Sequence, residues 1–161
     1  FMRFMFCLFI TIMEINKEFL SQLFEQAKEN PRMRQHFDLR TSSADTSQRM
    51  MNALLPNTEV PIHRHEDTSE TVVCLCGRLD EIIYEEVDAL LSPLTAEEAA
   101  AFDRGMDAQE VTQEKRFREV QRIRLCPAEG QYGCQIPKGA WHTIEVLEPS
   151  VIFEAKDGAY K

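Results

Sequence analysis

Short apolar runs, separated by Pro, Gly and Asn, most limit the folds open to this chain. The first group, from Gln48 to Glu86, reads RMMNALLP, EVPIHRH, ETVVCLCG and RLDEIIYEE. A second group, from Arg118 onward, reads REVQRIRLCP, GCQIPKG, WHTIEVLE and SVIFEAK. Runs of this length bounded by turn residues are typical of β-strands. Helices do not alternate with them one by one, so the pattern predicts a mainly β core rather than a parallel βαβ sheet.

Two segments have helical character instead. Residues 14–30 place apolar side chains at helical intervals and end at Asn30-Pro31, which predicts an N-terminal amphipathic helix. Residues 87–115 are rich in Ala, Glu and Gln, and they predict a helical insertion between the two groups of strands.

Length and composition favour one domain. A chain of 161 residues fits a single core, which we place at residues 13–161, and we interpret the apolar residues 1–12 as a leader outside the fold. That apolar run is too short to span a bilayer, so we expect no membrane partner. The net charge of −9 argues against a nucleic-acid partner. The irregular spacing of the five cysteines favours reduced thiols in a cytoplasm over a disulfide framework.

Three histidines and one glutamate form the pattern in this sequence that indicates a chemical function. His63 and His65 are two residues apart in an extended run, so both imidazoles point the same way. Glu70 opens the next apolar run after the polar turn EDTS, and a hairpin would return its carboxylate to the histidines. His142 follows the turn Pro137-Lys138-Gly139 far downstream, and a barrel would bring it close. We therefore predict a mixed imidazole and carboxylate metal site.

This pattern resembles the two motifs of the cupin superfamily. Asn57 to Gly77 resembles the first motif, a glycine, five residues, H-x-H, four residues, Glu, six residues and Gly, with Asn57 in place of the first glycine. Asn tolerates a left-handed backbone better than most residues, so the exchange is mild. Pro137 to His142 resembles the second motif, P-x-G-x-x-H, with its leading glycine displaced to Gly130 and Val146 where Asn often follows. The resemblance implies one cupin barrel, a double-stranded β-helix or jelly roll, with the helical insertion between its motifs.

From about Asn30 onward the chain is also similar to the WbuC-type cupin-fold metalloproteins. The similarity rests on PRMR, SQRMMNAL, the HRH…SE core, EGQYG, IPKGAWHT and the closing LEP…VIFEAKDGAY. It implies a bacterial cytosolic metalloprotein connected with lipopolysaccharide O-antigen gene clusters, whose reaction is open. Cupins often pair by strand exchange, which makes a homodimer an expectation.

The donor set predicts the cofactor only as a class. Three imidazoles and a carboxylate suit one divalent transition metal, Fe, Mn, Ni, Co, Zn or Cu, and affinity order alone does not choose among them. An open coordination position would allow Lewis-acid chemistry, as in a sugar isomerase or epimerase, or dioxygen binding at a redox metal. A non-catalytic binding module with a structural metal and a metal-free, epimerase-like cupin stay open as alternatives.

Contacts to a small sugar-like or anionic ligand are predicted from residue chemistry alone. Arg34 and Arg49 are the arginines we expect to hold a carboxylate or phosphate, because their fork-shaped guanidinium suits such groups. Tyr132 and Lys138, with Glu129, lie near the second motif and are candidates for proton transfer or substrate contact. Arg64 and Trp141 neighbour ligands in sequence, and alternation points them away from the metal.

Overall fold

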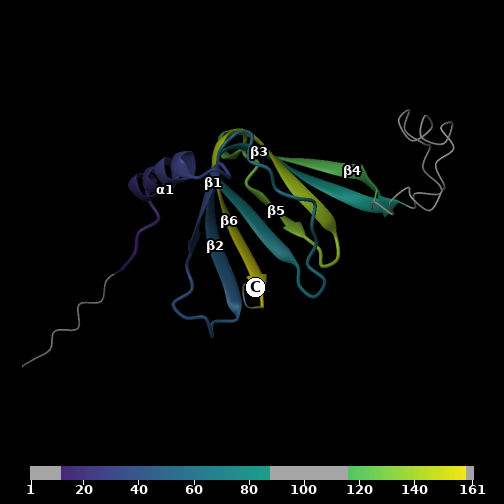
Figure 1. Ribbon diagram of the computed structural model, residues 1–161, viewed down its shortest axis with the longest axis horizontal. Helices are drawn as coiled ribbons and strands as arrows, with labels where there is room; N and C mark the ends of the chain where they lie inside the picture. Colours follow the sequence, from purple (N-terminus) through teal and green to yellow (C-terminus); the bar gives the residue numbers. More distant parts are fainter. Residues whose placement is uncertain (1–11, 88–115, 159–161) are drawn as a thin grey trace, which may run out of the picture.

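The computed structural model describes residues 12–87 and 116–158. Within them the chain is mainly β, with one N-terminal helix (Figure 1). The elements are α1 (Lys17–Glu29), β1 (Arg34–Asp38), β2 (Ser47–Leu54), β3 (Glu70–Val87), β4 (Arg116–Leu125), the 3-10 turn η1 (Pro127–Glu129), β5 (Gly133–Ile136) and β6 (Trp141–Asp157). None of the helices in these ranges is long and apolar enough to cross a membrane.

The N-terminal helix is shorter than the predicted residues 14–30. It begins at Lys17 because Asn16 caps it, its side chain accepting a hydrogen bond from the backbone N–H of Phe19 at 3.0 Å. Ile15, an apolar residue within the predicted range, lies outside the helix and is exposed. The predicted stop at Asn30 is confirmed.

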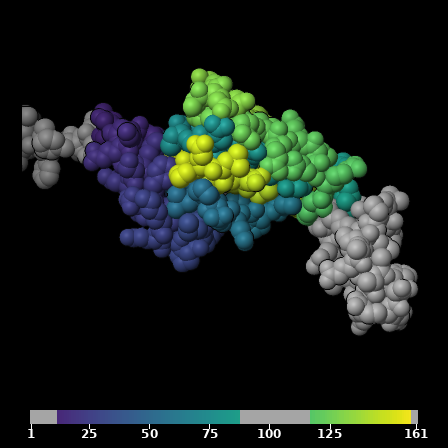
Figure 2. Space-filling view, turned by 90° about the horizontal axis from the view of Figure 1, so that it is seen from above, coloured from purple at the N-terminus to yellow at the C-terminus, as the bar shows by residue number. Residues whose placement is uncertain are grey.

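All pairs in the sheet are antiparallel, in the order β1-β2-β6-β3-β4, and β5 adds to β3. Figure 2 shows the C-terminal end of β6, in yellow, beside the blue segment that includes β2. The chain forms fewer, longer strands than the runs predicted. One strand, β3, contains both ETVVCLCG and RLDEIIYEE. Another, β6, contains both WHTIEVLE and SVIFEAK.

The long strands change register where the sequence suggested breaks. Cys74 pairs with Ile152 while Cys76 pairs with Val151, so one extra residue lies on β3. A bulge of this kind bends a strand and increases its twist. Gly77 lies in this irregular stretch at φ +91°, and a Cβ there would be 2.3 Å from the carbonyl oxygen of Pro149. The glycine therefore lets β6 pass close to the bend in β3.

The sheet packs apolar side chains on both faces. One core contains Leu54, Val72, Cys74, Leu79, Leu125, Ile136, Val146 and Ile152. The second lies under α1 and contains Leu23, Ala27, Met51, Ala53, Leu55 and Val151. Adjacent residues of β6, Val151 and Ile152, belong to different cores, as strand alternation requires.

Regular alternation along a strand that begins at Glu70 predicts that Val72, Cys74 and Cys76 share the face of Glu70. Val72 and Cys74 do so in the first core, but Cys76 packs against the second core under α1. The prediction for Cys76 was wrong because the bulge after Cys74 reverses the alternation.

Two predicted segments lie almost wholly outside the described residues. Of the predicted insertion at 87–115 only Val87, the end of β3, is described, and of the predicted leader 1–12 only Ile12 is described.

Candidate metal centre

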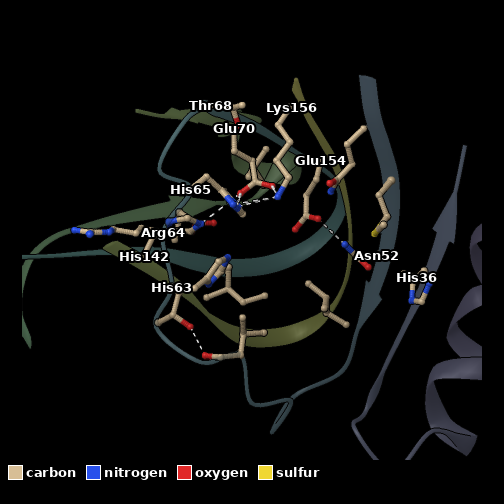
Figure 3. A pocket seen from close by; sticks show the side chains of 18 of the residues that line it. His36, Asn52, His63, Arg64, His65, Thr68, Glu70, His142, Glu154 and Lys156 are labelled. Atoms are coloured by element: carbon tan, nitrogen blue, oxygen red, sulfur yellow. Dashed lines mark hydrogen bonds and ion pairs between the residues drawn. The ribbon is translucent and has the colours of Figure 1, made fainter. Parts of the chain in front are cut away.

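The four predicted metal ligands converge at one point. One ligand atom each from His63, His65, Glu70 and His142, here called the His/Glu cluster, lies within 4.8 Å of every other. Figure 3 shows these side chains gathered at one side of a cavity. Glu70 is the first residue of β3 and His142 the second of β6, while the other two come from the segment before β3. The structure therefore brings together the same four residues that the hairpin and barrel arguments from sequence placed side by side.

The first two histidines are not in a regular strand, although EVPIHRH was predicted to be one. Only His63 pairs there, in an isolated bridge to His142. The backbone N–H of each donates to the carbonyl of the other, at 3.0 and 2.9 Å. This bridge fixes the first histidine segment directly against β6.

The turns that frame the site behave as the sequence indicated. Asn57 adopts φ +71°, the left-handed conformation for which it replaces glycine. Gly139, at φ +79°, donates its backbone N–H to the carbonyl of His65 at 2.7 Å. The second-motif turn is thereby tied to the H-x-H segment.

Hydrogen bonds to backbone carbonyls orient two of the imidazoles. Nδ1 of His63 lies 3.0 Å from the carbonyl oxygen of Pro61, and Nδ1 of His142 lies 2.9 Å from that of Ala140. A carbonyl only accepts, so in each ring Nδ1 carries the proton and Nε2 keeps its lone pair. Metal-binding histidines in proteins are commonly held in this way.

The Nε2 atom of His142 shows that the cluster fits a cation. It is buried and lies 3.3 Å from Oε2 of Glu70, yet within the described part of the chain it has no hydrogen-bond partner. A lone pair of nitrogen thus faces a lone pair of a carboxylate oxygen, which is unfavourable in a buried site. A metal ion bound between the two atoms would remove this conflict.

Protonation of the cluster suits metal ligation. Burial, with the nearby His142, lowers the pKa of His63. Burial also lowers the pKa of His65, against the opposing effect of Glu70. For Glu70, burial alone would raise the pKa, but the nearby Lys156 ammonium helps to hold it below its usual value. Neutral imidazoles and an ionised carboxylate are the forms that bind metals.

Three acidic or basic side chains near the cluster were not predicted. Nζ of Lys156 lies 3.0 Å from Nε2 of His65 and 3.9 Å from Oε1 of Glu70. Glu154 and Glu81 line the same cavity. Strand alternation could have indicated their position. Glu154 and Lys156 lie an even number of residues from the core residue Ile152 and so share its face of β6, and Glu81 likewise shares the face of Leu79 on β3.

The cavity beside the cluster has a volume of about 740 Å³, within the range of small-ligand sites. Of the predicted substrate contacts, only Arg34 is among its lining residues. Arg49 forms an ion pair with Asp45, and Tyr132 and Lys138 are exposed. The guanidinium of Arg64 lies 4.6 Å above the Trp141 ring. Substrate contact by Arg34, Arg49, Tyr132 and Lys138 stays a prediction.

Several solved structures match the chain at low sequence identity. KdgF from Halomonas sp. is 12% identical with a TM-score of 0.45, and the match covers 80% of each chain. TT1209 from Thermus thermophilus is 18% identical with a TM-score of 0.47, covering 91% of this chain and 98% of that one. The Cnp3 cupin domain of Schizosaccharomyces pombe is 7% identical with a TM-score of 0.44, covering 78% of this chain and 64% of that one.

At the level of sequence, no curated protein matches the chain significantly. The model of one family, described as a domain of unknown function, matches residues 15–95. That match spans the N-terminal helix, the H-x-H segment and the whole of β3, and it covers half of the chain. The chain therefore belongs to the DUF6016 family.

Proposed function

We propose that this protein is a cupin that binds one divalent transition metal through the His/Glu cluster. The observation that carries the proposal is the convergence of the four ligand atoms within 4.8 Å of one another. Orientation of His63 and His142 by backbone carbonyls supports it, because both rings offer Nε2 to the same point. Iron, manganese, nickel, cobalt, zinc and copper all suit this donor set.

The cavity beside the cluster is where we place a small sugar-like or anionic metabolite. Four protein ligands leave one or two positions on a five- or six-coordinate ion, and a ligand oxygen bound there would be polarised by the metal. Arg34 and Lys156 supply positive charge on the cavity wall for an anionic group. The similarity to WbuC-type cupins supports a narrower proposal, a role linked to lipopolysaccharide O-antigen assembly.

Elemental analysis of protein purified without added metal tests the metal proposal. We expect about one equivalent of a transition metal in the wild type and its loss in His63→Ala and in His142→Ala. His36→Ala is the matched control, since His36 lines the same cavity outside the His/Glu cluster, and it should retain the metal. Equal metal content in all four proteins would contradict the proposal.

A further inference from the structure

Two buried side chains of the cavity wall have polar atoms without partners. Glu81 is 1% exposed and Gln48 is 2% exposed, and both line the cavity. Among the described residues, no hydrogen-bond partner is present for either carboxyl oxygen of Glu81 or for Oε1 of Gln48. Leaving such a group unsatisfied in a buried position is unfavourable. Unpartnered polar groups that face a cavity indicate a ligand that would pair with them.

These groups lie on the strands that also position the metal centre. Gln48 is on β2, Glu81 is on β3 after the bend, and Glu154 is on β6 two residues before Lys156. Nδ2 of Asn52 donates to Oε2 of Glu154 at 2.7 Å, and Figure 3 shows this contact. The strands therefore hold Gln48, Glu81 and Glu154, here called the inner wall, around the same space as the His/Glu cluster.

The protonation states of the two inner-wall carboxyl groups determine which ligand groups could pair with them. Burial and the negative charges of Glu154 and Glu70 raise the pKa of Glu81 to about 9. Burial and the charge of Glu70 raise the pKa of Glu154 to about 7. At neutral pH Glu81 is thus a carboxylic acid with one donor and one acceptor, and Gln48 Oε1 is an acceptor.

A hydroxyl group matches this wall better than a charged group does. It donates and accepts, as the protonated Glu81 does, whereas a carboxylate only accepts and would meet Glu70 and any ionised fraction of Glu154. An ammonium only donates, and it would have to ionise the buried Glu81 to gain a charged partner. A ligand with several hydroxyls could satisfy Gln48 and Glu81 together without a buried net charge.

We propose that the inner wall is a subsite for the hydroxyl groups of a polyhydroxylated ligand, held by Gln48, Glu81 and Glu154. The inference rests on the proposed function, since it assigns the same cavity and deepens the ligand class from sugar-like or anionic to hydroxyl-bearing. The metal orients one end of the ligand, and the inner wall recognises the hydroxyls beyond it.

Ligand-observed NMR on the protein as purified tests the ligand class. Erythritol, glucitol, glucose and galactose are the hydroxylated probes, and 1,4-diaminobutane and succinate are four-carbon probes that replace the hydroxyls with charges. We expect saturable binding of at least one hydroxylated probe and none of the diamine. Any succinate held by the metal, Arg34 or Lys156 should bind equally well to wild type and Glu81→Leu, because it does not need the inner wall. Binding of only the diamine or succinate, or of no probe, would overturn the subsite.

Two variants of Glu81 test the residue. We expect Glu81→Gln to keep the affinity for the bound probe within about threefold, because the amide still donates and accepts. Glu81→Leu should weaken that affinity at least tenfold, while its melting temperature stays equal to the wild type or rises, because an unpartnered buried acid is removed. Unchanged probe affinity in Glu81→Leu would overturn the proposal.

Metal content in the same samples separates this inference from the proposed function. Glu81 is not in the His/Glu cluster, so the leucine variant should keep its metal. Full metal with no effect on probe binding would refute only the subsite. Wild-type protein without metal that still binds glucitol through Glu81 would refute the metal proposal and leave the subsite.

Discussion

Two imidazoles of the His/Glu cluster are each oriented by a hydrogen bond from one ring nitrogen, and the other ring nitrogen points to the candidate metal position. His63 and His142 both donate Nδ1–H to a carbonyl two residues earlier in the chain, Pro61 and Ala140. Because the acceptor belongs to the local backbone, ring orientation depends little on distant packing. The ligand atoms are thus preorganised, which lowers the entropic cost of binding a metal.

Lys156 is the residue whose removal should strengthen the site. Its ammonium lies 3.0 Å from Nε2 of His65, so it repels a divalent cation bound there. We expect Lys156→Met to increase metal affinity about tenfold, or ~1.4 kcal/mol, measured by competition with a chromophoric chelator. Lys138→Met, which removes an exposed lysine within the second-motif turn, is the control and should leave affinity unchanged. Weaker binding in Lys156→Met would mean that the ammonium supports the site by orienting His65.

The ligands could be predicted from sequence, but their surroundings could not. His63, His65 and Glu70 lie within eight residues, and His142 follows a Pro-x-Gly turn, so spacing and turn chemistry were sufficient. Glu81 and Glu154 were missed because an acid within an apolar run reads as the exposed half of an alternating strand. Alternation relates Glu81 to Leu79 and Glu154 to Ile152, but the register between β3 and β6 is needed to show that this face lines the cavity.

The bend in β3 is the element on which the two-faced core depends. It moves Cys76 to the core under α1 while Cys74 stays in the other core. The backbone N–H of Arg78 donates to Oγ of Ser150 at 2.9 Å, so β6 is tied to β3 just after Gly77. Strand lengths were underestimated from sequence because Gly77 and Pro149 look like breaks, whereas here they face each other across a continuous pair.

Gly77→Ala should therefore destabilise the fold strongly. The new Cβ would lie 2.3 Å from Pro149 O and Ser150 Oγ, at a φ of +91° that side chains rarely adopt. We expect a loss of about 3 kcal/mol in the free energy of unfolding, measured by urea denaturation. Gly130→Ala has a similar φ of +80° with open space around it and should cost only about 1 kcal/mol. Equal losses in the two variants would show that backbone conformation, not the close approach of β6, makes Gly77 necessary.

A metal in the His/Glu cluster would join parts of the whole molecule that are distant in sequence. It would connect the H-x-H segment, the start of β3 and the start of β6, which together line one cavity. Binding to the folded state alone stabilises that state by mass action, because the unfolded chain does not hold these ligands together. The stability of the entire fold should then depend on metal concentration.

We expect the melting temperature of metal-stripped protein to rise when zinc or manganese is restored. At a metal concentration 100 times the dissociation constant the gain is about 2.7 kcal/mol, which corresponds to roughly 5–10 °C for a chain of this size. His142→Ala should show almost none of this rise, and His36→Ala should show all of it, because only His142 belongs to the cluster. The comparison is made by differential scanning calorimetry at matched free-metal concentrations. An equal rise in both variants would place the bound metal elsewhere on the protein, since a site without His142 cannot draw β6 to the H-x-H segment.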